Sequence, residues 1–180
     1  LFVLNFQTGG RTKLSAVPGL NISPAWSPDG EWVALSLSKD GGTNIYLMRK
    51  DGRGLRALTT GSGISVSPTF SPNGRQVAFT SDRGGTPQIY AIDLEGTNLR
   101  RLTFQGDYNS SPRWSPRGDK IAFVSNLSGR FQITLVDDCS RMLAAAVLGR
   151  RTAAAVCAAL PALFATFPFV VRELTPLLQT

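Results

Sequence analysis

The side chains that most often perform acid–base, nucleophilic or metal chemistry are scarce in this chain. Its 180 residues contain no histidine, which excludes a Ser-His-Asp or Cys-His catalytic arrangement, and a histidine-ligated metal, within the sequence. The two cysteines, Cys139 and Cys157, lack the close paired spacing of a zinc site. We therefore expect no catalytic residue, no cofactor and no metal site, and a protein that is not an enzyme.

Charged and aromatic residues in the predicted loops are better suited to contacting another protein. Asp40, Asp82 and Asp107 belong to three different loops without the spacing of cation ligands, so they do not indicate a calcium-type site. Tyr and Arg are favoured at protein interfaces because they combine a large contact area with directed hydrogen bonds. The candidate partner-binding residues are Asp82, Arg83, Asp107, Tyr108 and Asn109. The competing interpretation is that Asp82 caps its own loop and that Arg83 is only solvated.

A repeat of 44 residues predicts the elements that position these side chains. A Ser-Pro-X-Gly turn preceded by an aromatic residue recurs at this interval, with its prolines at Pro28, Pro72 and Pro116. Self-similarity at a period of about 40–50 residues, with several short strands in each unit, is typical of a β-propeller blade. The strands expected in the middle unit are Ser67–Ser71, Gln76–Thr80, Gln88–Ile92 and Leu99–Thr103.

The fold class expected from the repeat is all-β: an incomplete β-propeller of four-stranded blades over residues 1–137. Residues 1–15 fit the end of one blade, and further blades are expected at 23–59, 67–103 and, incomplete, 111–137. Because the chain begins inside a repeat, we interpret it as part of a longer protein. The recurring alanines (Ala34, Ala78, Ala122) and the aromatic residues before each turn, Trp26 and Trp114 among them, are expected in the core.

Four-stranded blades place two kinds of loop at one end of a propeller. These are the loops between the second and third strands and the connections between consecutive blades. All five candidate residues fall in such loops, which predicts that they share one face. Loops carried by a rigid scaffold are where binding residues concentrate.

The repeat stops after Asp137, and residues 138–180 have a different composition. Residues 141–180 contain ten alanines and no Asp, Asn, Lys, Ser, Ile, Tyr or Trp. Three interpretations of this non-homologous tail stay open. It is the product of a shifted reading frame, a membrane segment, or an appended helix on the propeller edge. The membrane interpretation rests on the uncharged stretch Thr152–Val171, which is long enough to span a bilayer but contains Pro161 and Pro168.

The net charge of +7 does not indicate nucleic-acid binding. Lys and Arg are scattered along the chain, whereas a nucleic-acid footprint requires a coherent basic face. Nucleic acid is therefore not an expected partner.

The motifs quoted next resemble one family. The stretch SPAWSPDGEWVALSLSKDGGTNIYLM, followed by SDRGGTPQIY and RRLTFQGDYNSSPRWSP, is similar to the C-terminal propeller of the TolB family, built from WD40-like PD40 repeats. The resemblance covers about residues 1–137. It implies a six-bladed propeller behind a smaller α/β domain, residence in the periplasm, and binding to the lipoprotein Pal of the Tol–Pal system. It also implies a role in outer-membrane integrity and cell division, and membrane association through the partner.

Two functions from different classes are consistent with these motifs. The first is a non-enzymatic protein-binding scaffold whose partner is Pal, with other Tol proteins as further partners. The alternative is the propeller domain of a prolyl-oligopeptidase-type serine peptidase whose catalytic domain is missing. Such a peptidase needs a Gly-x-Ser-x-Gly nucleophile elbow and a downstream histidine, and neither is present in the sequence.

Overall fold

The computed structural model describes residues 1–39, 41–127, 129–137 and 143–146. Within these ranges the regular structure consists of β-strands, and no helix is present. Asp40, Cys139, Cys157 and the stretch Thr152–Val171 lie outside the described residues, so the interpretations placed on them stay predictions.

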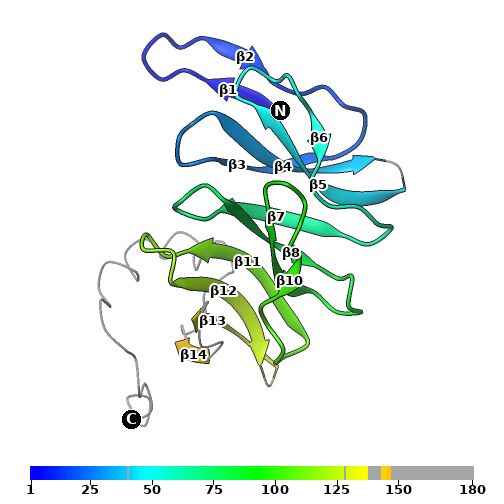
Figure 1. Cartoon of the computed structure of the whole chain (residues 1–180), viewed down its shortest axis with the longest axis vertical. Helices are drawn as coiled ribbons and strands as arrows, with labels where there is room; N and C mark the ends of the chain where they lie inside the picture. Colours follow the sequence, from blue (N-terminus) through cyan, green and yellow to red (C-terminus); the bar gives the residue numbers. More distant parts are fainter. Residues whose placement is uncertain (40, 128, 138–142, 147–180) are drawn as a thin grey trace.

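The strands form one two-stranded sheet and three four-stranded sheets, which follow one another along the long axis of the molecule (Figure 1). The two-stranded sheet contains β1 (Phe2–Leu4) and β2 (Arg11–Lys13). The first four-stranded sheet contains β3 (Asn21–Trp26), β4 (Trp32–Lys39), β5 (Gly42–Arg49) and β6 (Arg56–Ala57). The second contains β7 (Ser65–Phe70), β8 (Gln76–Ser81), β9 (Gln88–Asp93) and β10 (Arg100–Arg101). The third contains β11 (Tyr108–Trp114), β12 (Lys120–Leu127), β13 (Arg130–Asp137) and β14 (Leu143–Ala146).

Each four-stranded sheet is an antiparallel meander in which every strand pairs with its neighbours in sequence. This is the blade topology that the repeat predicts. The expected fold class, an incomplete β-propeller, is therefore confirmed. The strand β14 lies within the stretch 138–180 and pairs with β13 through Leu135↔Ala144, which is one period beyond the pairing Ala91↔Arg100 of β9 with β10.

The innermost strand of every blade contains the same irregularity. The register between the first two strands shifts at a Ser-Pro pair in each blade. Proline cannot donate a hydrogen bond to the ladder, so it is tolerated in a strand mainly at an edge or a bulge. The preceding serine adopts a positive φ of 53° at Ser23, 55° at Ser67 and 56° at Ser111, a conformation that non-glycine residues rarely adopt. The sequence motif thus fixes a β-bulge at one position of each blade.

The Ser-Pro-X-Gly turn joins the first two strands of each blade. The Ser71 hydroxyl accepts a hydrogen bond from the Gln76 amide at 3.0 Å and donates to Asn73 Oδ1 at 2.7 Å. Gly74 has a φ of 70°, which favours glycine. A Cβ added at Gly74 would lie 3.7 Å from the Pro28 ring, so the turns of consecutive blades lie against one another.

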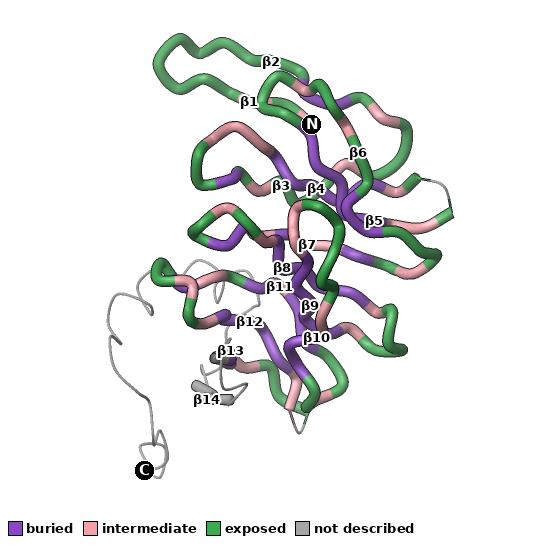
Figure 2. Tube along the Cα trace, viewed as in Figure 1, coloured by how far each residue is buried: buried purple, intermediate pink, exposed green. Residues whose placement is uncertain are grey.

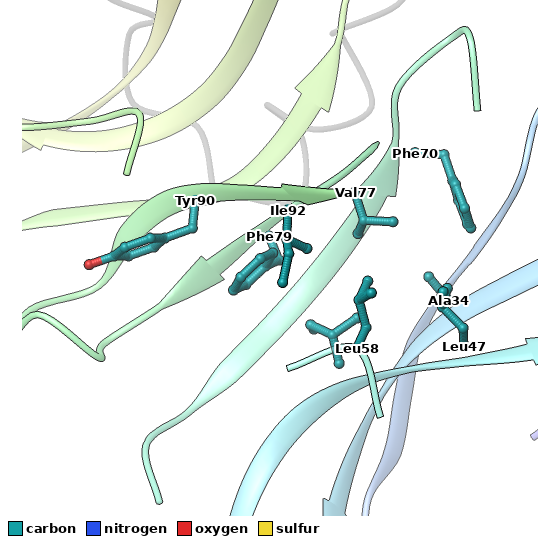
Figure 3. Close-up of a cluster of buried hydrophobic side chains, with 9 residues drawn as sticks. Ala34, Leu47, Leu58, Phe70, Val77, Phe79, Tyr90 and Ile92 are labelled. Atoms are coloured by element: carbon teal, nitrogen blue, oxygen red, sulfur yellow. The ribbon is translucent and has the colours of Figure 1, made fainter. Parts of the chain in front are cut away.

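The core lies between the sheets, on the middle strands of each blade (Figure 2). The cluster between the first two four-stranded sheets joins two sets of side chains (Figure 3). Its members are Ala34, Ile45, Leu47 and Leu58 on one side and Phe70, Val77, Phe79, Tyr90 and Ile92 on the other. The recurring alanines Ala34, Ala78 and Ala122 are no more than 1 % exposed, as predicted.

Trp26 corrects one expectation. It was predicted to lie in the core, but 47 % of its surface is exposed. Phe70, at the same position of the next blade, packs against the preceding four-stranded sheet and is only 7 % exposed. On the corresponding side of Trp26 the described residues place only the short strands β1 and β2, so Trp26 lacks the cover that Phe70 receives.

Candidate functional site

The candidate residues lie at one end of the blades, where the β8–β9 loop and the β10–β11 connection meet. Hydrogen bonds between neighbouring blades join the loops of this face. The Thr43 amide donates to the Gly63 carbonyl at 3.2 Å, and the Asn109 amide donates to the Pro87 carbonyl at 2.8 Å. We call this end, formed by the β4–β5, β8–β9 and β12–β13 loops with the β2–β3, β6–β7 and β10–β11 connections, the loop face. It is the shared face that blade topology predicts.

Asp82, the first residue after β8, is held by the connection that precedes its own blade. Its Oδ1 accepts a hydrogen bond from the Ile64 amide at 2.7 Å, and its amide donates to the Ile64 carbonyl at 3.2 Å. A Cβ added at Gly63 would lie only 2.6 Å from Asp82 Oδ1, so the approach of these two segments requires a glycine. Asp82 therefore fixes the β6–β7 connection and is itself half-buried.

Arg83 is ordered by contacts within its own blade. Its Nε donates to Ser81 Oγ at 3.1 Å and its Nη2 to Ser65 Oγ at 3.2 Å. The guanidinium carbon lies 5.3 Å from the ring centroid of Phe79 and 5.4 Å from that of Tyr90, within the range of a cation–π contact. Partial burial lowers the pKa of Arg83 below its ordinary value. Arg83 as a whole residue is nevertheless exposed, so both interpretations of it, partner-binding and solvated, stay open.

The other three candidates lie where the β10–β11 connection enters β11. Asp107 is exposed. Tyr108 is 39 % exposed and meets the Phe131 ring edge-on, with centroids 5.8 Å apart. Asn109 is only 1 % exposed, and its Nδ2 donates to Gln88 Oε1 at 2.8 Å and to the Gln105 carbonyl at 2.7 Å. Asn109 thus holds the joint between two blades, and its expected role in partner binding stays a prediction.

A hollow of about 210 Å³ brings two of the candidates together. It lies between the inner strands β7 and β11, and both Asp82 and Tyr108 line it. Arg83 and Asn109 are not among its lining residues, because their side chains bond to Ser65 and Gln88 respectively.

Among the exposed apolar residues on the loop face, Tyr108 was singled out from the sequence, but Leu20, Ile64 and Phe131 were not. Leu20, Ile64 and Tyr108 lie 44 residues apart, next to or at the start of the inner strands, and are 52 %, 54 % and 39 % exposed. Phe131 adds a fourth exposed apolar side chain, 58 % accessible. The repeat itself carries the signal that would have found Leu20 and Ile64, because an apolar residue recurs at the position of Tyr108, outside the predicted core.

Metal and membrane sites receive no support from the described part of the chain. In residues 1–39, 41–127, 129–137 and 143–146, no three Asp, Glu or Cys side chains gather closely enough to hold a metal ion. The same residues include no helix with the length and apolar character needed to cross a bilayer.

Curated relatives of the chain are Tol–Pal system proteins. TolB of Francisella tularensis subsp. mediasiatica is 39 % identical over 61 residues, which cover 33 % of this chain and 14 % of the relative. TolB of Alcanivorax borkumensis is 46 % identical over 41 residues, covering 23 % of this chain and 9 % of the relative. The matched part thus spans a small share of these proteins.

Solved structures with the same fold include TolB from Acinetobacter baumannii, which is 34 % identical with a TM-score of 0.74, covering 80 % of this chain and 36 % of that one. A putative TolB from Agrobacterium tumefaciens is 29 % identical with a TM-score of 0.65, covering 72 % and 50 % of the two chains. Puromycin hydrolase, at 20 % identity and a TM-score of 0.64, covers 78 % of this chain and 24 % of that one and shares the fold alone. The family model PD40, the TolB β-propeller domain, matches residues 1–152, and this chain therefore belongs to the TolB β-propeller family.

Proposed function

We propose that this chain is a non-enzymatic protein-binding scaffold in the periplasm, and that its loop face binds the lipoprotein Pal. Membership of the TolB β-propeller family and similarity to Tol–Pal system proteins support this proposal. Through Pal the protein associates with the outer membrane and supports membrane integrity and cell division. Other Tol proteins are further partners of the same system.

The observation that carries the proposal is the set of exposed apolar side chains on the loop face, of which Ile64 and Tyr108 are the central pair. Ile64 and Tyr108 flank the hollow beside Asp82, and both are exposed despite their apolar character. Aromatic and apolar side chains surrounded by polar groups are typical of the centre of a protein interface. The cross-blade hydrogen bonds hold the backbone of the segments that carry these side chains before a partner arrives, which reduces the entropy lost on binding.

A direct binding assay with a matched pair of variants tests the proposal. The full chain is titrated with soluble Pal from the same source, and Tyr108→Ala is compared with Leu99→Ala. Leu99 is 45 % exposed and lies in the β9–β10 connection at the opposite end of the blade. We expect Tyr108→Ala to weaken binding about tenfold, as for an interface aromatic, and Leu99→Ala to leave it unchanged. Absence of Pal binding by the unsubstituted chain would refute the proposal.

The peptidase propeller is the alternative function. The similarity to puromycin hydrolase is too distant to favour it. Sequencing the gene that encodes this chain separates the two functions. A hydrolase domain in the same reading frame supports the peptidase, whereas a neighbouring lipoprotein gene supports the Tol–Pal scaffold.

A further inference from the structure

The hollow between β7 and β11 has an uneven chemical lining. Its apolar walls come from Ile64, Val66, Pro87 and Tyr108, and Asp82 with serine and threonine residues lines the remainder. Asp82 is the one charged residue among the described residues that line it. A hollow of about 210 Å³ with these walls accommodates one long side chain rather than a drug-sized ligand, since ligand pockets usually measure about 300–1,000 Å³.

The walls of this hollow are fixed by bonds across two blades. The Ser111 amide donates to Thr80 Oγ1 at 3.0 Å, which joins β11 to β8. Asp82 is oriented by the Ile64 amide through its Oδ1. A carboxylate held in this way keeps its position at the hollow without a bound partner, so little side-chain entropy is lost when a cation arrives.

The neighbouring cation Arg83 interacts with the Asp82 charge through space, but its side-chain hydrogen bonds go to serines. The closest basic residue in sequence, Arg83, directs its guanidinium to Ser65 and Ser81 and lies over the Phe79 and Tyr90 rings. Asp107, the residue before Tyr108, is exposed and does not line the hollow. The charge at the hollow is therefore negative, while most of its wall is apolar.

We propose that this hollow binds a single basic side chain, arginine or lysine, presented by the partner protein. Such a side chain combines a hydrocarbon stem, which suits Ile64, Val66 and Pro87, with a cation that reaches Asp82. The Tyr108 ring offers the same cation an aromatic face. This inference rests on the proposed binding of a protein to the loop face, and it adds the chemistry that the partner must carry there.

Small probes test the hollow independently of Pal. The full chain, labelled with ¹⁵N, is titrated with Nα-acetyl-arginine amide and, separately, with Nα-acetyl-norleucine amide, which keeps an apolar stem but has no charge. We expect the arginine probe to shift the amide resonances of Ile64 and Tyr108 in a saturable manner at millimolar concentration. The norleucine probe should bind about three- to fivefold more weakly, the contribution expected of a partly exposed ion pair.

Two substitutions separate the effect of the Asp82 charge from its structural role. Asp82→Asn retains an oxygen that can accept the hydrogen bond from the Ile64 amide, so the fold is preserved while the charge is lost. Asp107→Asn removes an exposed charge that does not line the hollow. We expect Asp82→Asn to abolish the preference for arginine over norleucine and Asp107→Asn to retain it. In the unsubstituted chain, raising the salt concentration should weaken binding of the arginine probe until its affinity approaches that of the norleucine probe.

The outcomes distinguish this inference from the proposed function. Equal binding of the two probes, or no shift at Ile64 and Tyr108 with the arginine probe, overturns the basic side-chain pocket even when Pal binds. A selective response to arginine that disappears in Asp82→Asn supports the pocket, and it does so also when Pal fails to bind and the proposed partner is wrong.

Discussion

The buried hydroxyl of Thr103 is the group whose loss should reveal most about how the blades are joined. Thr103 is 2 % exposed. Its Oγ1 accepts a hydrogen bond from the Ile89 amide at 2.9 Å and donates to Gln88 Oε1 at 2.7 Å. Gln88 Oε1 also accepts from Asn109 of the next blade. Thr59 makes the same pair of bonds, to the Ile45 amide and Asn44, one period earlier.

The substitution Thr103→Val keeps the size of the side chain and removes the hydroxyl. It leaves the buried Ile89 amide without a hydrogen-bond acceptor. Gln88 Oε1 also loses one of the hydrogen bonds that it accepts. A buried donor left without a partner costs about 1–3 kcal/mol, so we expect the free energy of unfolding to fall by about 2 kcal/mol. For a chain of this size that corresponds to a decrease in Tm of about 4–8 °C.

Urea unfolding followed by tryptophan fluorescence measures this change, with Thr97→Val as the control. Thr97 lies in the exposed β9–β10 connection, so its hydroxyl remains solvated and its loss should change stability by less than about 0.5 kcal/mol. Equal stabilities of the two variants would show that the hydroxyl of Thr103 does not hold the outer strand, and the reasoning would be refuted.

Three further predictions concern the core, a turn and the acid stability of the fold. Phe79→Ala, at a side chain that is fully buried between two blades, should lower the free energy of unfolding by about 3–5 kcal/mol in urea unfolding; a loss under 1 kcal/mol would contradict the packing. Gly74→Ala, at a φ of 70°, should cost about 1–2 kcal/mol in the same assay. Hydrogen bonds from Gln76 and Asn98 lower the pKa of Asp93 below its ordinary value, so its contribution to stability is present above the unfolded pKa and is lost as the pH falls through the lower, folded pKa. Between pH 5 and pH 2.5, the acid-induced decrease in Tm should therefore be smaller for Asp93→Asn than for the unsubstituted chain. An equal decrease would show that the hydrogen bonds of Asp93 do not contribute to the pH dependence of stability.

Much of the fold could be predicted from the sequence because the motif for each strand and turn recurs in several copies of the repeat. The expected strand Gln88–Ile92 is observed as β9 (Gln88–Asp93), and the expected Gln76–Thr80 as β8 (Gln76–Ser81). The outer strand is shorter than the expected Leu99–Thr103, since pairing is limited to Arg100 and Arg101.

The candidate site was only partly predictable. Blade topology places the five candidate residues at one face, but it does not say which of them are buried. Asn109 is buried, and its side-chain amide donates a hydrogen bond to Gln88 of the preceding blade. Arg83 donates hydrogen bonds to two serines on neighbouring strands. The Asn109–Gln88 and Arg83–Ser65 contacts link residues that are 21 and 18 positions apart in the sequence. The exposure of Trp26 likewise depends on what lies beside it and not on its own motif.

Hydrogen–deuterium exchange of the chain with and without Pal tests most directly whether the loop face is the binding surface. We predict slower exchange on adding Pal in residues 60–66 and 104–110, and no change in residues 71–75 and 94–98, which lie at the opposite end of the same blades. Protection of 71–75 and 94–98, with residues 60–66 and 104–110 unaffected, would contradict the account.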